Sequence, residues 1–137
     1  MRNQAEYFQR VKQNFDKRYV RRLEHVQIFC RDALNVIDNT DDSGTFFFLD
    51  PPYNDTSLGH YEGYSKEDYI ALLERLKGVK GKFLLTSFPT DILSRYTREN
   101  GWKTINNVMH LSASVKEGKM KTEVFTMNFS SRQGRLF

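Results

Sequence analysis

An apolar run that ends at the tetrapeptide Asp-Pro-Pro-Tyr, residues 50–53, constrains the fold of this chain more than any other feature. The run itself, Phe46 to Leu49, predicts a fully buried strand, because consecutive apolar residues occupy both faces of a sheet. The prolines lack the backbone N–H that a strand needs, so the strand has to end at Asp50. A carboxylate is therefore expected at the carboxyl end of a buried strand, where open α/β sheets bind their ligands.

The groups at this strand end suit methyl transfer to an aromatic amine. The exocyclic nitrogen of a nucleobase is a poor nucleophile, since its lone pair is delocalised into the ring. The Asp50 carboxylate and the carbonyl of Pro52, whose ring fixes the local backbone, would accept the two amine hydrogens and release the lone pair to attack a methyl group. Tyr53 would stack on a base taken out of its duplex. The alternative is a strand that simply ends in a proline turn.

On Asp50, Pro51, Pro52 and Tyr53, the chain resembles the Dam-type family of DNA adenine-N6 methyltransferases, which carry Asp-Pro-Pro-Tyr at this position. The resemblance covers residues 23–129. It implies that these four residues are catalytic, and that the chain transfers a methyl group from S-adenosylmethionine to a flipped adenine in DNA. Methylation of cytosine N4, an RNA base or a protein amide is a weaker alternative, because related enzymes for those substrates more often carry Ser or Asn in place of Asp50.

A second carboxylate, Asp32, follows the largely apolar segment Val26–Phe29, which predicts a short strand. The resembling family places an acidic residue here to hold the adenosyl amine. The resemblance therefore implies that Asp32, Ala33 and Asp50 bind the cofactor. Asp32 also suits the N-cap of a helical turn that begins at Ala33, and the two roles are compatible.

The chain departs from the family in the other half of the cofactor site. Family members carry a glycine-rich loop, Phe-x-Gly-x-Gly, after their first strand, whereas the first glycine here is Gly44. Two further family strands lie between those that match Val26–Phe29 and Phe46–Leu49, which leaves a gap, and unpaired sheet edges recruit partners. A complementing N-terminal methyltransferase chain, a remnant of a broken gene and direct pairing of the two strands all remain open. A non-catalytic DNA-binding or clamp-docking accessory is the alternative function.

The rest of the chain predicts alternating helices and strands. Ser65 and Asp68 form a capping-box pattern at the start of one helix, and Gly101 ends another. Tyr61 and Tyr64, in the loop before Ser65, would either close over the target base or pack. The fold class is α/β, a partial Rossmann-like methyltransferase sheet with a C-terminal antiparallel hairpin. Helices are expected over 4–22, 33–37, 65–78 and 90–100, and further strands over 83–86, 102–111 and 123–129.

The excess positive charge lies at the start of the chain. Residues 1–22 contain seven basic and two acidic residues, while the formal net charge of the whole chain is +4. We predict that they form a basic amphipathic helix, distinct from the catalytic portion at 23–129. This helix would lie against DNA phosphates or present an ordinary solvated face.

The last residues, 130–137, form a polar tail that ends in Gln133-Gly134-Arg135-Leu136-Phe137. The pattern Gln-x-x-Leu-Phe resembles short peptides by which bacterial DNA-processing proteins dock to the replication sliding clamp. Leu and Phe would fill a pocket while the glutamine bonds its rim. The alternative is a tail that packs on its own domain.

Other features argue against several classes of protein. No apolar run approaches the roughly 18 residues of a membrane span, and no secretion signal is evident, so a cytoplasmic protein is expected. The single Cys30 predicts a buried, inert thiol. The three histidines lie far apart in the sequence, so we predict no metal site.

Overall fold

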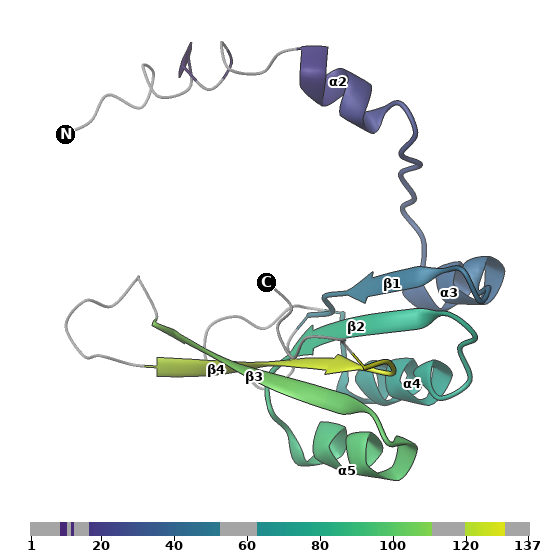
Figure 1. Cartoon of the computed structure of the whole chain (residues 1–137), viewed down its shortest axis with the longest axis vertical. Helices are drawn as coiled ribbons and strands as arrows, with labels where there is room; N and C mark the ends of the chain where they lie inside the picture. The colour runs from purple at the N-terminus through teal and green to yellow at the C-terminus, as the bar shows by residue number, and fades with distance from the viewer. Residues whose placement is uncertain (1–8, 11, 13–16, 53–62, 111–119, 131–137) are drawn as a thin grey trace. The chain divides into compact units, whose positions relative to one another are not determined.

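The computed structural model describes residues 9–10, 12, 17–52, 63–110 and 120–130 (Figure 1). The chain divides into two compact units, residues 1–31 and 32–137. The first contains helix α2 (Lys17–Leu23), and residues 9, 10 and 12 are also helical. The helix predicted over 4–22 is therefore confirmed in the part of it that the structure describes.

Two predictions about the first unit are wrong. Residues 26–29 form no strand, and Ile28 is 85% exposed. An isolated strand has nothing with which to pair its backbone, so apolar composition alone does not form one. Cys30 is exposed rather than buried, because the segment that carries it does not pack into a core.

The second unit is a mixed α/β domain with a four-stranded sheet. Its elements are α3 (Ala33–Thr40), β1 (Phe46–Leu49), α4 (Lys66–Leu76), β2 (Lys82–Ser87), α5 (Asp91–Asn100), β3 (Lys103–His110) and β4 (Met120–Met127). The strand order is β1-β2-β4-β3, with β1 parallel to β2 and the other pairs antiparallel. The α/β class and the antiparallel pairing of the last two strands are thus confirmed. Helix α3 continues three residues beyond the predicted Ile37.

The hydrophobic core lies on one face of the sheet, where Figure 1 shows α4 and α5. Phe83 is fully buried there, and its ring meets Trp102 edge to face at 5.0 Å. Helix α4 contributes the four residues that its periodicity predicts, namely Tyr69, Leu72, Leu73 and Leu76.

Strand β1 is not fully buried, contrary to the prediction. Phe47 faces the core and is 8% exposed, whereas Phe46 and Phe48 are 52% and 63% exposed. The reason is that β1 is an outer strand, hydrogen-bonded to β2 alone in the sheet, and the main core cluster packs on its Phe47 face. On the opposite face, the inner strands bury Leu84 and Met127, whereas the outer strand leaves Phe46 and Phe48 exposed.

The local end signals of the helices are confirmed. The Ser65 hydroxyl accepts from the Asp68 N–H at 3.1 Å, and the Asp68 carboxylate accepts from the Ser65 N–H at 2.7 Å, which completes the capping box. Thr90 caps α5 in the same way as Ser65 caps α4, by accepting from the Leu93 N–H. Gly101 ends α5 with φ of 65°, a left-handed conformation that glycine adopts without steric cost.

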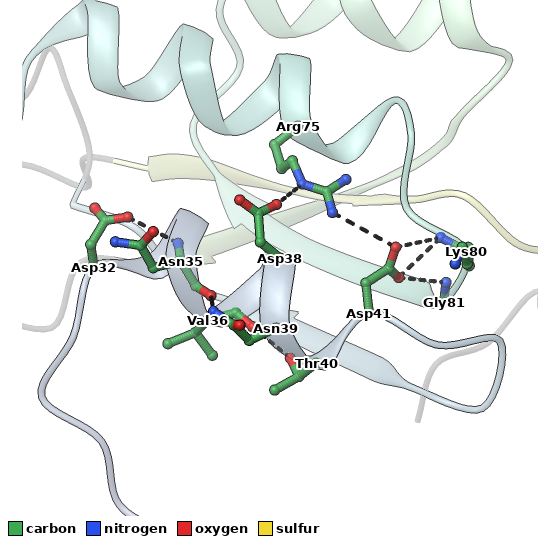
Figure 2. A network of polar contacts seen from close by, with 10 residues as sticks. All are labelled: Asp32, Asn35, Val36, Asp38, Asn39, Thr40, Asp41, Arg75, Lys80 and Gly81. Atoms are coloured by element: carbon green, nitrogen blue, oxygen red, sulfur yellow. Dashed lines mark hydrogen bonds and ion pairs between the residues drawn. The ribbon is translucent and has the colours of Figure 1, made fainter.

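A carboxylate cluster fastens the end of α3 to the segment before β2 (Figure 2). The Asp41 carboxylate accepts from the backbone N–H groups of Lys80 and Gly81, each at 3.0 Å, and lies 3.8 Å from the Arg75 guanidinium. Asp38 bonds the same guanidinium through Arg75 Nε. These contacts hold the pKa of Asp41 below its ordinary value of 3.8, chiefly through the Lys80 backbone hydrogen bond.

This cluster predicts acid sensitivity. Because the pKa of Asp41 is lower in the folded chain, the unfolded chain binds more protons, so stability rises with pH. The contribution is complete above pH 3.8 and is lost as the pH falls below that value. Urea unfolding between pH 2.5 and 6 measures this effect. We expect the free energy of unfolding to fall less steeply with decreasing pH in Asp41→Asn than in the native chain. Some decline will persist, since the pKa values of Asp68 and Glu74 are also lowered. Identical declines in the two proteins would contradict the assignment to Asp41.

Candidate functional site

A cavity of about 460 Å³ opens at the carboxyl end of β1. Both predicted carboxylates, Asp32 and Asp50, line it, together with the two prolines that follow Asp50 in the Asp-Pro-Pro-Tyr motif. The structure therefore brings the two halves of the predicted site together, although 16 residues of sequence lie between Ala33 and Asp50. The lining includes Asp32, Ala33, Asp50, Pro51, Pro52 and Tyr64.

Asp50 follows β1 directly and is exposed. Its Oδ1 atom accepts a hydrogen bond from Thr86 Oγ1 at 2.7 Å. Thr86 lies on β2 and is 5% exposed, so the donor is built into the sheet. The exposed carboxylate is accordingly held at the cavity by a buried partner. The predicted stacking residue, Tyr53, lies outside the described residues.

Asp32 caps α3, as one of its two predicted roles requires. Its Oδ1 atom accepts from the Asn35 backbone N–H at 3.1 Å (Figure 2). The same residue and Ala33 line the cavity, so capping fixes the position of a carboxylate that also faces ligand space. Binding of an adenosyl amine by Asp32 stays a prediction.

Tyr64 lines the cavity and also packs into the core. Its ring packs against the core cluster, and its hydroxyl is buried with no hydrogen-bond partner among the described residues. Burial raises the pKa of Tyr64 to about 12, with smaller contributions from Tyr69 and Asp68. The hydroxyl therefore keeps its proton at neutral pH. Tyr61, the other tyrosine considered from the sequence, lies outside the described residues.

The comparison with protein families identifies the chain. The family model of the D12 class of N6 adenine-specific DNA methyltransferases matches residues 1–123. This chain belongs to that family. The match confirms the resemblance to Dam-type enzymes; it begins at residue 1 rather than 23 and ends at residue 123 rather than 129. No curated protein matches the chain.

Membership in the D12 class raises the question of whether the cavity suits a methyl donor. Its volume lies within the roughly 300–1,000 Å³ of small-molecule sites. The carboxylates of Asp32 and Asp50 suit the single amino group of an adenosine and the positive charge of a sulfonium. The residues present thus fit the adenosyl part of S-adenosylmethionine. The described residues contain no group of three His, Cys, Asp or Glu side chains placed to hold a metal ion.

Among the described residues, no helix has both the length and the apolar character to span a membrane.

Proposed function

We propose that the Asp50 cavity is the catalytic site of a DNA adenine-N6 methyltransferase that uses S-adenosylmethionine as its methyl donor. The observation that carries the proposal is the exposed Asp50 carboxylate at the mouth of a ligand-sized cavity, hydrogen-bonded to the buried Thr86. Membership in the D12 class supports the reaction type.

In this proposal the chain's own groups act on the target adenine. The carboxylate of Asp50 and the carbonyl of Pro52 accept hydrogen bonds from the two N–H groups of the adenine amine, which draws the nitrogen towards a tetrahedral shape. As the nitrogen gains the methyl group the carbon–sulfur bond breaks, and the amine then loses one of these two protons. Tyr53 stacks on the flipped base. S-adenosylmethionine, when bound, supplies a methyl group on a positively charged sulfur. Most of the acceleration then comes from alignment of the amine by these residues.

We further propose that a complementing polypeptide segment supplies the glycine-rich half of the cofactor site. Two features support this idea. The sequence has no glycine before Gly44, and β1 pairs with β2 alone in the sheet while exposing Phe46 and Phe48. An outer strand with exposed aromatic residues is typical of an edge that accepts another strand.

Two measurements test the proposed function. Calorimetry measures S-adenosylmethionine binding to the full chain, alone and with a candidate chain from a neighbouring reading frame. Transfer of a tritiated methyl group to unmethylated genomic DNA then measures catalysis, with N6-methyladenine identified in the nucleoside digest. We expect binding and transfer in at least one of the two conditions. Neither binding nor transfer in any condition would refute the proposal and favour the non-catalytic accessory.

Two partner predictions depend on residues that the structure describes only in part or not at all. We propose that the basic segment 1–22 contacts DNA phosphates, and that Gln133–Phe137 docks to a bacterial sliding clamp. The tail lies outside the described residues. Two results together would refute the clamp proposal. A peptide ending at Phe137 would show no saturable binding to a clamp, and deletion of Gln133–Phe137 would leave clamp binding by the full chain unchanged.

A further inference from the structure

The pairing of β1 with β2 sets a specific neighbour beside Asp50. The two strands run parallel in the register Phe48 with Leu84 and Leu49 with Leu85. One residue further along, this register places Asp50 opposite Thr86, with both side chains on the same face of the sheet. The contact between them therefore follows from the fold of the sheet rather than from the chance position of a surface side chain.

The chemistry of this contact is directional. An ionised carboxylate is an acceptor only, whereas a threonine hydroxyl has a single hydrogen to donate. Thr86 Oγ1 lies 2.7 Å from Asp50 Oδ1 and 3.3 Å from the Leu49 carbonyl oxygen. The carboxylate is the nearer and stronger acceptor, and the distance matches that of a charge-assisted O–H···O⁻ bond. The donor is also rigid, because a β-branched side chain in a strand has few χ1 options.

We propose that Thr86 is a positioning residue that sets the Asp50 carboxylate for the target amine, an inference that rests on the proposed function. A carboxylate offers about four lone-pair sites, and the Thr86 bond uses one of them while restricting rotation about χ1 and χ2 of Asp50. The carboxylate is then presented to the substrate in one orientation. Methyl transfer needs such alignment, since a displacement of about 1 Å in a reacting geometry costs on the order of 10²-fold in rate.

A purely structural role for the hydroxyl makes a different prediction. In that case Thr86 would only satisfy a buried polar group, and removal of the hydroxyl would change the free energy of unfolding without changing the rate of the chemical step. The two roles are separated by substitutions that keep or remove the hydroxyl at nearly constant volume.

The test uses the full chain, alone or with the candidate partner chain, whichever of these two conditions supports methyl transfer. Thr86→Val removes the hydroxyl, Thr86→Ser keeps it, and Thr86→Ala provides a second hydroxyl-free variant if valine prevents folding. Thr126→Val is the matched control. Thr126 is a fully buried threonine on β4, and its Oγ1 has no hydrogen-bond partner among the described residues. Methyl transfer to unmethylated DNA gives kcat and the KM for S-adenosylmethionine, while scalar couplings in labelled protein give the χ1 population of Asp50.

We expect Thr86→Val to lower kcat about 30-fold, with a KM for S-adenosylmethionine within about threefold of the native value. Thr86→Ser and Thr126→Val should retain native kcat, and the single Asp50 rotamer should be lost only in the hydroxyl-free Thr86 variants. Native kcat in Thr86→Val, or an unchanged Asp50 rotamer, would overturn the positioning role. Absence of methyl transfer by the native chain would refute the proposed function instead, and the couplings would still decide whether Thr86 orients Asp50.

Discussion

Asp50→Ala is expected to abolish methyl transfer, with a fall in kcat of about 10³-fold, comparable to the loss of one preorganised polar contact to a reacting group. The substitution removes the acceptor that draws one amine hydrogen away from the ring plane, and it leaves the buried Thr86 hydroxyl without its carboxylate partner. The measurement is the rate of tritiated methyl transfer to DNA at saturating S-adenosylmethionine.

Asp42→Ala is the matched control for this prediction. Asp42 is also an exposed aspartate, but it lies before the start of β1, and its carboxylate accepts from the Gly44 backbone N–H at 2.9 Å. The control should therefore affect the loop and leave kcat near the native value. If Asp50→Ala retains more than a tenth of native kcat, the carboxylate is not the group that activates the amine.

The aromatic residue of the same motif should behave differently. Tyr53→Phe keeps the ring face and is expected to retain most of the activity, since stacking on a flipped base needs a π-face rather than a hydroxyl. A loss equal to that of Asp50→Ala would show that the Tyr53 hydroxyl matters more than its ring. The comparison assigns separate roles to two residues only three positions apart.

The sequence was most informative where a signal is local. The Ser65–Asp68 capping box depends on groups three residues apart, and Gly101 ends α5 through its own backbone conformation. The α4 core residues follow from helical periodicity alone. Such features need no knowledge of which distant segments meet.

The errors come from contacts between distant segments. Val26–Phe29 lies in a unit whose described residues contain no strand with which it could pair. Strand β1 is half exposed because it pairs with β2 alone in the sheet. The position of Asp50 at the end of β1 was predictable from its motif, since two prolines after an apolar run locate the strand end. Thr86 was not, because a threonine on a strand carries no signal until the β1–β2 register places it beside Asp50.

Gly81→Ala is expected to destabilise the second unit by about 3 kcal/mol, at the upper end of the cost of overpacking a site. A Cβ atom at Gly81 would lie 2.6 Å from the Thr45 carbonyl oxygen and 2.9 Å from that of Asp42. Both atoms belong to the backbone, so neither can move aside as the end of a side chain can. The segment leading into β1 must shift, which weakens the Lys82 N–H bond to the Thr45 carbonyl, now 2.9 Å long.

Gly78→Ala is the matched control, because the nearest atoms to its added Cβ lie 3.8 Å and 4.0 Å away. Its free energy of unfolding should stay near the native value or rise by up to about 1 kcal/mol, since alanine has fewer unfolded conformations than glycine. Urea midpoints at a constant m-value measure both variants. Equal midpoints would show that the segment leading into β1 accommodates the added Cβ atom without loss of stability. Because Asp50 directly follows β1, the shift in Gly81→Ala should also separate that carboxylate from Thr86 and lower kcat in the molecules that remain folded.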